Sequence, residues 1–355
     1  MNGNKGELSE VYAFLKLLSD GEMQSGDGQL NAIPGKKFPI ISVFRDRSPI
    51  RFEYHVDAQS HKINIVGPSH SSSRNQSEFD AEAKALLDKI IRLNESPDFT
   101  DTERFLDSIG VTKVKASSRD KDDIRLIIHD FRRGITPEMG YSIKSRLGGN
   151  STLVNTCGDG SNFLYEVLNI DNNTMCLFNE EKYFKKKFEI LKQNGSTVVF
   201  KRVVSSNFNA NITLIDSCLP MIAAQCLLCY YAERKKDLSI VAATLAQRNS
   251  LGYDISTQPL MYEYKLKQFL LACALGMTPA TIWNTKFNAN GGYIVVKEDG
   301  DIVCYHFFDR NELEDYLFCH SYFETPSTTK HCFGNIEKAS DEKYYLKLNI
   351  QVRFK

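Results

Sequence analysis

The residues with the clearest chemical potential lie in one predicted β-hairpin, whose strands cover residues 121–130 and 140–145. Folding the hairpin about its turn places Asp123 opposite Lys144, at a Cβ separation of roughly 4.5–5.5 Å. Ser142 shares a face with Lys144 because alternate residues of a strand point the same way. A carboxylate, a hydroxyl and an ammonium group would then meet at the open end of the hairpin. Such a cluster can hold Mg²⁺ against a phosphate group, as nuclease chemistry requires.

The register of this hairpin depends on a turn predicted at residues 133–134, where a glycine supplies the backbone conformation that tight turns need. Asp130 is the competing candidate for the catalytic acid, but it would face Pro137, several residues from the lysine. Asp122 points to the other face, where we expect a solvent or strand-edge charge. We therefore prefer Asp123. The other interpretation of the hairpin alone is a surface ion pair worth under about 1 kcal/mol.

The elements that must position this hairpin follow from the hydrophobic pattern. Residues 79 to 168 predict the order helix, helix, strand, strand, strand, helix, strand, which is compatible with an α/β sandwich. The predicted helices are 8–18, 79–91, a short one from 100, another after 151, 180–194, 219–234, 238–248, 259–275 and 311–318. The predicted strands are 38–44, 50–56, 62–66, 111–116, 162–168, 292–297, 302–306 and 344–354, and residues 68–75 are expected to form a polar loop.

Composition bounds the class of protein. The 355 residues suffice for one large or two ordinary domains, and 42% of them are hydrophobic. Nothing resembles a signal peptide or a membrane span, and nine scattered cysteines indicate a reducing compartment, so we expect a soluble cytoplasmic protein. The net charge of zero disfavours an indiscriminate nucleic-acid binder but allows a local positive face. We divide the chain into an N-terminal helix and small β region, a catalytic core and a mainly helical C-terminal region, covering residues 1–75, 76–205 and 206–355.

The hairpin resembles the PD-(D/E)XK nuclease core, with Asp123 in the Asp position and Ser142-Ile143-Lys144 in the (D/E)XK position. Further segments, in the same order along the chain, resemble the HpaII family of type II restriction endonucleases. These segments are 140–148, 151–155, 161–166, 262–270, 274–279 and 324–329. The resemblance extends from about Glu10 to Arg353, and it is least distinctive before Asp80.

The resemblance implies a mixed α/β fold, with a PD-(D/E)XK core carrying N-terminal and C-terminal additions for DNA recognition. It also implies Mg²⁺ as the cofactor. Asp123 would be a metal ligand, and Ile143 would offer its backbone carbonyl as a second one. Lys144 would stabilise charge on the phosphate or orient the attacking water.

Ser142 departs from the general motif because a hydroxyl cannot replace the charge of a carboxylate. We therefore expect another acid to complete the site as a catalytic and metal-binding residue. Glu82 is the first choice, since its helix should pack on the sheet with its tip near the metal. Glu78, Asp159 and Glu166 are the alternatives, and the sequence does not decide among them.

A restriction enzyme reads bases through groups such as Arg, Lys, Asn and Gln. The loop after the catalytic strand starts beside the scissile bond and is rich in such residues, although its serine and threonine are also ordinary helix caps. Two later polar segments are further candidates. The candidate DNA-binding residues are Arg146, Asn150, Ser151, Thr152, Asn155, Asn162, Lys265, Lys267, Thr328 and Lys330.

The leading hypothesis is a Mg²⁺-dependent type II restriction endonuclease acting on double-stranded DNA, with CCGG as the target to which the resemblance points. A functionally paired DNA methyltransferase is implied by restriction biology, and a palindromic target would fit a homodimer. Two alternatives remain. A non-catalytic DNA-binding protein on a nuclease scaffold is suggested by the missing carboxylate at Ser142, and a structure-specific repair nuclease would cut irrespective of sequence.

Overall fold

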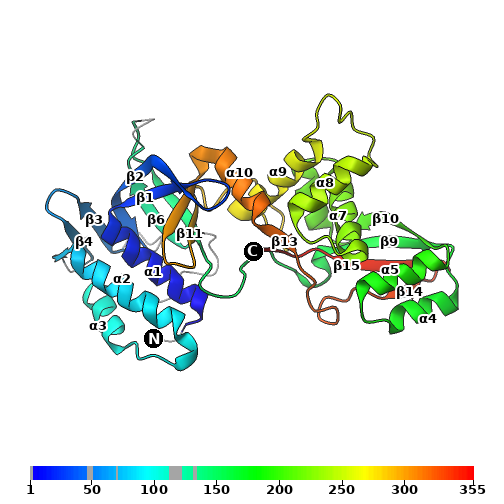
Figure 1. Ribbon diagram of the computed structural model, residues 1–355, viewed down its shortest axis with the longest axis horizontal. Helices are drawn as coiled ribbons and strands as arrows, with labels where there is room; N and C mark the ends of the chain where they lie inside the picture. The colour runs from blue at the N-terminus through cyan, green and yellow to red at the C-terminus, as the bar shows by residue number, and fades with distance from the viewer. Residues whose placement is uncertain (1–2, 46–50, 69–70, 112–121, 131–133) are drawn as a thin grey trace. The chain divides into compact units, whose positions relative to one another are not determined.

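A computed structural model describes residues 3–45, 51–68, 71–111, 122–130 and 134–355, and Figure 1 shows its elements. Contact density divides the chain into two compact units. Unit 1 comprises residues 1–151 and 287–316, and unit 2 comprises residues 152–286 and 317–355. The three segments expected at 1–75, 76–205 and 206–355 follow the order of the chain. The units do not, because each is assembled from segments that are distant in the sequence.

Unit 1 is built around a mixed sheet with nine described strands, in the order β1-β12-β11-β7-β6-β2-β3-β4-β5. Strand β1 also pairs with β2, so the first six strands in this order close into a ring. The bounds are β1 (Glu22–Gly26), β2 (Ala32–Phe44), β3 (Glu53–Asp57), β4 (Lys62–Val66), β5 (Ser71–Asn75), β6 (Ile124–Ile128), β7 (Glu138–Ser145), β11 (Gly292–Val296) and β12 (Ile302–His306).

The long strand β2 makes this closure possible. Its first half, up to Pro39, pairs with β1, and its second half, from Ile40 to Phe44, pairs with β6. The buried side chains of Phe38 and Val43 lie in the two halves, so one strand contributes to the core along its length. The change of partner along this single strand closes the ring.

Helix α1 supplies much of the core of unit 1. A capping box between Asn4 and Glu7 fixes its start, and a left-handed Gly21 ends it. It contacts α2 along its length and also contacts β7, so it lies beside the candidate hairpin (Figure 1). The helices of unit 1 are α1 (Lys5–Asp20), α2 (Gln76–Ile91), α3 (Thr100–Ser108) and the short η1 (Leu93–Glu95) and η3 (Phe307–Asp309), while α10 (Arg310–Cys319) begins here and ends in unit 2.

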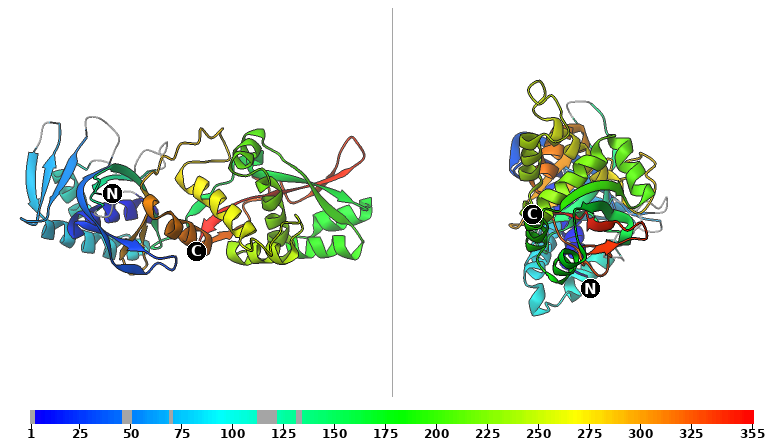
Figure 2. Two further views of the ribbon diagram at one scale, coloured as in Figure 1. Left: turned by 90° about the horizontal axis from the view of Figure 1, so that it is seen from above. Right: turned by 90° about the vertical axis from the view of Figure 1, so that its right-hand side faces the viewer.

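Unit 2 contains two antiparallel sheets and most of the helices (Figure 2). One sheet has the order β10-β9-β15-β14, and the other has the order β13-β16-β8. Helices α6 and α7 contact β10, and α4 contacts β14. The bounds are β8 (Thr152–Val154), η2 (Gly158–Ser161), β9 (Asn162–Leu168), α4 (Asn172–Glu180), α5 (Phe184–Gln193), β10 (Thr197–Val203), α6 (Ser206–Ile215), α7 (Leu219–Glu233), α8 (Leu238–Arg248), α9 (Met261–Leu275), β13 (Ser321–Phe323), β14 (Ile336–Lys338), β15 (Tyr344–Asn349) and β16 (Val352–Phe354).

The mixed α/β class is confirmed, as are the two predicted hairpins and the main helices. Three local predictions are wrong. The expected loop at 68–75 contains β5, the expected helix after 151 is β8, and the expected strand at 344–354 is split between two sheets. The conformations of β8 and of residues 344–354 depend on pairing with strands far away in the sequence, which local sequence does not record. Strand β5 pairs with β4, the strand before it. Of the strand expected at 111–116, only residue 111 is among the described residues.

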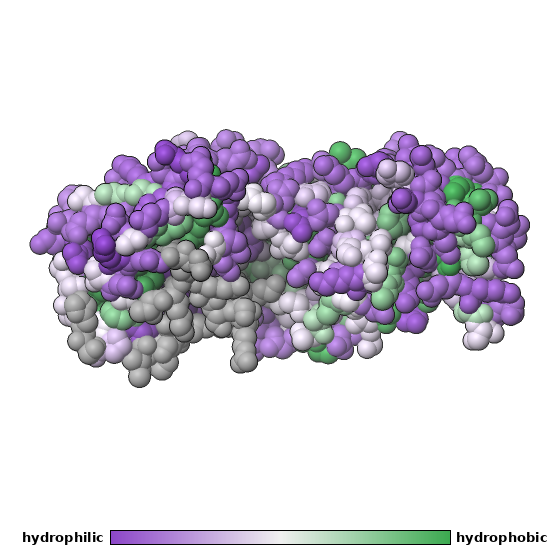
Figure 3. Space-filling view, turned by 90° about the horizontal axis from the view of Figure 1, so that it is seen from below, coloured by the Kyte–Doolittle hydropathy of each residue, from purple (hydrophilic) through white to green (hydrophobic). Residues whose placement is uncertain are grey.

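No single helix in the described chain is long and apolar enough to cross a membrane, and α6 and α7 meet that test only as a pair bent by 106°. On the face drawn in Figure 3, the described residues are mostly hydrophilic, and apolar residues gather in small separate patches.

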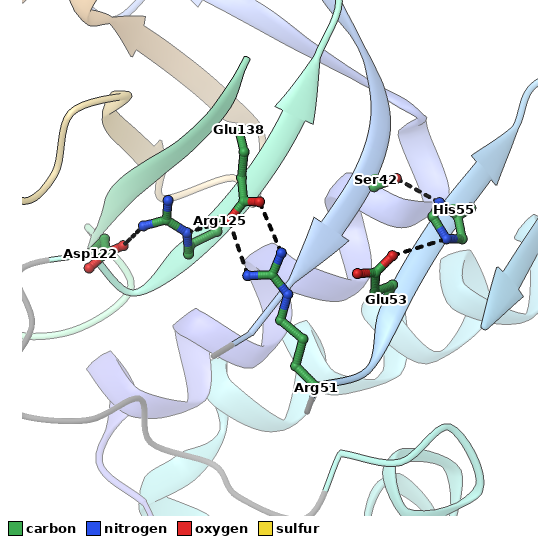
Figure 4. A network of polar contacts seen from close by, with 7 residues as sticks. All are labelled: Ser42, Arg51, Glu53, His55, Asp122, Arg125 and Glu138. Carbon is green, nitrogen blue, oxygen red and sulfur yellow. Dashed lines mark hydrogen bonds and ion pairs between the residues drawn. The ribbon is translucent and has the colours of Figure 1, made fainter. Parts of the chain in front are cut away.

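A network of charged side chains holds the hairpin of β6 and β7 together (Figure 4). Both oxygens of Glu138 accept hydrogen bonds from Arg51, at 3.0 and 2.9 Å, and Arg125 Nε adds a third at 2.7 Å. Arg125 also donates to Asp122 Oδ2 at 2.9 Å. Asp122 is therefore buried, with a side chain 1% exposed, and the expectation of a solvent or edge charge is wrong because Arg125 neutralises it.

We expect this network to make stability depend on pH. Hydrogen bonds from Arg51 and Arg125 lower the pKa of Glu138 to about 2, below its ordinary value of 4.5. The stabilisation is therefore complete above pH 4.5 and is lost as the pH falls toward 2. Glu138→Gln should lower the free energy of unfolding by about 1–2 kcal/mol at neutral pH. Measured by urea denaturation, this loss of stability should become smaller as the pH falls through that window.

Glu95→Gln is the control, because Glu95 is exposed and has no ion pair among the residues that the structure describes. A Glu138→Gln effect of equal size at neutral pH and near the lower end of the window would contradict this role of the network.

Candidate nuclease site

Asp123 stands immediately before β6, and its carboxylate is held by the neighbouring strand. Asp123 Oδ2 accepts hydrogen bonds from Ile143 N at 2.7 Å and from Ser142 Oγ at 3.1 Å. Its own backbone N–H donates to the carbonyl of Tyr141 at 2.8 Å. Strand β7 extends past the start of β6, so the Asp123 side chain takes the place of a backbone acceptor for Ile143.

The predicted register of the hairpin is wrong by two residues. Ile124 pairs with Tyr141, so Asp123 faces Ser142 instead of Lys144. Asp130 likewise pairs with Ile135 and not with Pro137. A shift of two preserves the faces of both strands, so the cluster of carboxylate, hydroxyl and ammonium still forms. The predicted turn includes residues 131–133, which lie outside the described residues.

Ser142 connects the acid to the lysine. Its hydroxyl donates to Asp123 and accepts a hydrogen bond from Lys144 Nζ at 2.7 Å. A hydroxyl can do both, whereas an ionised carboxylate can only accept and would repel Asp123. Lys144 Nζ also lies 5.1 Å from the centre of the Tyr293 ring, on the parallel strand β11. Ser142 therefore positions both charged groups without adding a charge.

The cluster opens into a cavity of about 440 Å³ in unit 1. The cavity is bordered by the start of α1, the end of β7 and the loop that follows β7. Its lining residues are Asn4, Lys5, Gly6, Glu10, Asp123, Ile143, Lys144, Ser145, Gly148, Gly149 and Ser151. Two carboxylates, those of Asp123 and Glu10, therefore line one space together with the Lys144 ammonium.

Glu10 is the residue that the sequence analysis missed, and Glu82 does not reach the cavity. Gln76 Nε2 donates to the carbonyl of Leu18, which places the start of α2 against the end of α1. Glu82 therefore lies beside the C-terminal half of α1, while the N-terminal half lines the cavity. Glu82 Oε1 is buried and accepts no hydrogen bond from the described residues. The sequence did carry a signal for Glu10, because this acid lies within the mostly buried stretch of α1.

Arg45 adds a partly buried positive charge near the two acids. It directly follows β2, whose last residue, Phe44, pairs with Arg125 on β6. Its guanidinium carbon lies 5.5 Å from the centre of the Phe14 ring on α1. Burial lowers the pKa of Arg45, and the charges of Glu10 and Asp123 oppose that shift. The guanidinium thus offsets part of the repulsion between the two carboxylates.

The other candidate acids are occupied elsewhere. Glu78 accepts from the backbone N–H of Asn75 in the capping box of α2. Asp159 and Glu166 belong to unit 2, where Asp159 accepts from Asn162 and Glu166 pairs with Lys201. None of them lines the cavity that holds Asp123.

The donor set of the cavity fits a magnesium ion. Mg²⁺ prefers oxygen ligands and is usually bound through one or two carboxylates, with water and phosphate completing the shell. Asp123 and Glu10 supply two carboxylates. The carbonyl of Ile143 points to the same edge of β7 as that of Tyr141, because alternate residues direct their backbone groups the same way. Groups of three or more acidic, His or Cys side chains suited to a metal are absent from the described chain.

The loop after β7 lies partly at this cavity. Ser151 lines it, whereas Arg146 forms an ion pair with Glu298 at 3.4 Å. Asn150 is exposed. Ser151 therefore lies at the cavity that holds Asp123, and Arg146 and Asn150 are neighbours in the chain of residues that line it.

The structure corrects one candidate DNA contact. Asn162 is fully buried, donates to Asp159 and to the carbonyl of His331, and accepts from Asn349 at 2.6 Å. It is a structural residue because every polar atom of its side chain already has a partner. Thr152 is the first residue of β8, and Asn155 is exposed just after that strand.

The remaining candidates are distributed over unit 2. Lys265 is paired with Asp216, and Lys267 pairs with Glu263 at 2.6 Å, so both ammonium groups are partly buried against acids. Thr328 and Lys330 are exposed on the loop before β14. No contact with DNA is assigned to these four residues by the geometry.

Comparison with known proteins places these features in context. The family model described as HpaII restriction endonuclease matches residues 4–354. The chain is 38% identical to the type II restriction enzyme HpaII of Haemophilus parainfluenzae, over 99% of this chain and 98% of that enzyme. No solved structure matches.

The packing of Asp122, the neighbour of Asp123 in the chain, depends on a glycine across the hairpin. A Cβ at Gly140 would lie 2.3 Å from Asp122 Oδ2 and 2.8 Å from Asp122 Cβ. Gly140→Ala should therefore displace the neighbour of Asp123 and lower the free energy of unfolding by about 1–3 kcal/mol, measured by urea denaturation. Gly149→Ala is the matched control, because no atom lies within 4 Å of its added Cβ. Equal effects of the two substitutions would contradict the steric account.

Proposed function

This chain belongs to the HpaII restriction endonuclease family, and from that premise we propose that it is a type II restriction endonuclease that hydrolyses double-stranded DNA. The observation that carries the proposal is the shared cavity of Asp123, Glu10 and Lys144, with Ser142 bridging the acid and the lysine. We propose Mg²⁺ as the cofactor and CCGG as the target, the latter from the similarity to HpaII.

In this proposal, Asp123, Glu10 and the carbonyl of Ile143 hold the metal. When bound, Mg²⁺ supplies a Lewis acid that polarises the phosphate and favours deprotonation of the attacking water. Asp123 is kept in place by two hydrogen bonds, so its carboxylate needs little reorganisation. The Lys144 ammonium, oriented by Ser142, stabilises the negative charge that develops on the phosphate oxygens.

The presence of Glu10 bears on the alternative of a non-catalytic DNA-binding protein. That alternative was motivated by the serine in place of the motif carboxylate. Glu10 restores the number of carboxylates at the cavity, so a serine at position 142 does not by itself imply lost activity. A repair nuclease is disfavoured by the family to which the chain belongs.

The wider setting is proposed on chemical grounds. The substrate is duplex DNA, so we place the enzyme in the bacterial cytoplasm beside a methyltransferase that protects the same sites. A homodimer would match the twofold symmetry of CCGG. Arg146, Asn150 and Ser151 are the proposed contacts nearest to the reaction, since they follow Lys144 in the chain.

The test is digestion of unmethylated plasmid DNA with Mg²⁺, followed by sequencing of the fragment ends. Wild type should give discrete fragments with ends at CCGG, and Asp123→Asn should give none. Glu10→Gln should reduce the rate by at least about 100-fold, whereas Glu82→Gln should stay near wild type. Binding of Mn²⁺ followed by electron paramagnetic resonance should weaken in Asp123→Asn and Glu10→Gln only.

The outcomes separate the alternatives. Binding of duplex DNA without cleavage by wild type, with Mg²⁺ or Mn²⁺, would indicate the non-catalytic binder. Cleavage without discrete ends would indicate a structure-specific nuclease. A loss of activity in Glu82→Gln but not in Glu10→Gln would overturn the assignment of the second acid.

A further inference from the structure

Unit 2 contains a cavity of about 870 Å³, distinct from the acidic site of unit 1. It is formed by the junction of α4 and α5, by the segment 328–335 and by strands β14 and β15. Its charged lining consists of four lysines and three glutamates, namely Lys182, Lys187, Lys338, Lys347, Glu180, Glu181 and Glu337.

Lys187 is the unusual member of this lining. It is only 5% exposed, although it carries an ammonium group. Its Nζ donates to the carbonyl of Gly334 at 2.7 Å and to Asn335 Oδ1 at 3.2 Å, both of them neutral acceptors. The ammonium also lies 4.7 Å from the centre of the Phe178 ring. No carboxylate of the described residues lies within the 4.0 Å limit of an ion pair.

A buried cation without an anion is costly, because desolvation takes several kcal/mol per ion and neutral dipoles recover only part of it. Buried lysines are accordingly rare unless they are paired. Burial lowers the pKa of Lys187 to about 8, with the Glu181 charge opposing the shift, so the group remains largely cationic at neutral pH. The fold thus keeps a positive charge in the cavity with no carboxylate of the described residues in ion-pair contact with it.

Three of the six other charged residues that line the cavity are engaged with other groups, and the acids Glu180 and Glu337 are exposed. Glu181 accepts hydrogen bonds from the backbone N–H groups of Lys182 and Tyr183. Lys338 pairs with Glu342, and Lys347 lies 3.5 Å from Asp159. Lys182 has no such acid among the described residues, so it is the second cation available at the cavity.

The cavity wall is also held in shape. Asn179 and Ile336 exchange two hydrogen bonds, and Gly334 N donates to the carbonyl of Lys347 at 3.0 Å. A Cβ at Gly334 would lie 2.8 Å from Phe184 Cζ, which indicates close packing of the segment on α5. The acceptors of Lys187 are therefore fixed, and the site is preorganised.

We propose that this cavity binds a phosphate group, with Lys187 as its buried cation and Lys182 as a second one. The source we favour is the backbone of the DNA substrate, a choice that rests on the proposed function. Free inorganic phosphate offers the same chemistry and is the other source that the test must distinguish.

The test compares full-length Lys187→Met with Lys185→Met, which removes the same charge from the exposed side of the same helix. Binding of a fluorescent CCGG duplex is measured by anisotropy in EDTA over a range of salt concentrations. Lys187→Met should weaken binding about 10-fold and reduce the slope of log K against log salt by about 0.9, as the loss of one phosphate contact requires. Lys185→Met should leave the slope unchanged.

A second arm measures stabilisation of wild type by inorganic phosphate in thermal melts. Saturable stabilisation that is lost in Lys187→Met, together with unchanged DNA binding, would support the site and assign it to free phosphate. If neither DNA nor phosphate distinguishes Lys187→Met from Lys185→Met, the proposal is overturned and Lys187 is a structural cross-link alone.

Two controls keep the result interpretable. Circular dichroism verifies the fold of Lys187→Met, and Lys182→Met probes the same cavity at an exposed position if Lys187→Met fails to fold. Digestion of CCGG sites by wild type is measured in parallel. If wild type cleaves CCGG sites and neither cavity variant has an effect, only the phosphate site is refuted. If wild type does not bind DNA, the proposed function is refuted, and the measurement with inorganic phosphate still tests the site.

Discussion

The candidate site depends on one hydrogen bond, from the backbone N–H of Ile143 to the carboxylate of Asp123. Strand β6 begins one residue after Asp123, while β7 continues, so Ile143 would otherwise lack a partner on that edge. An unsatisfied backbone N–H costs about 1–3 kcal/mol when it is buried. The carboxylate therefore meets a structural need of the sheet, and the same need fixes the acid where Ser142 and Lys144 can join it.

The rest of unit 1 supports that contact from segments far apart in the sequence. Strand β11 flanks β7 in parallel and brings Tyr293 to Lys144. Helix α1 contacts β7 and brings Glu10 to the cavity. The ion pairs of Arg51, Arg125 and Glu138 tie the two strands at a second point and bury Asp122 beside Asp123. The site is thus a property of the assembled unit and not of the hairpin alone.

Local patterns predicted the strands of the hairpin and the shared face of Ser142 and Lys144, because period-two alternation is a local property. They did not predict the register, which depends on the turn, nor Glu10, which is near Asp123 only through the packing of α1. Asn162 looked like a polar contact residue, but its partners His331 and Asn349 come from distant segments. The strand β8 was likewise missed because its partner β16 is far from it in the sequence.

The central claim is that Glu10, and not Glu82, joins Asp123 in holding the metal. The most direct measurement is anomalous diffraction from crystals of the full-length protein soaked in Mn²⁺. The account predicts an anomalous peak in contact with the carboxylates of Asp123 and Glu10 and with the carbonyl of Ile143. A peak ligated by Glu82, or one that contacts Asp123 while Glu10 faces away, would contradict it.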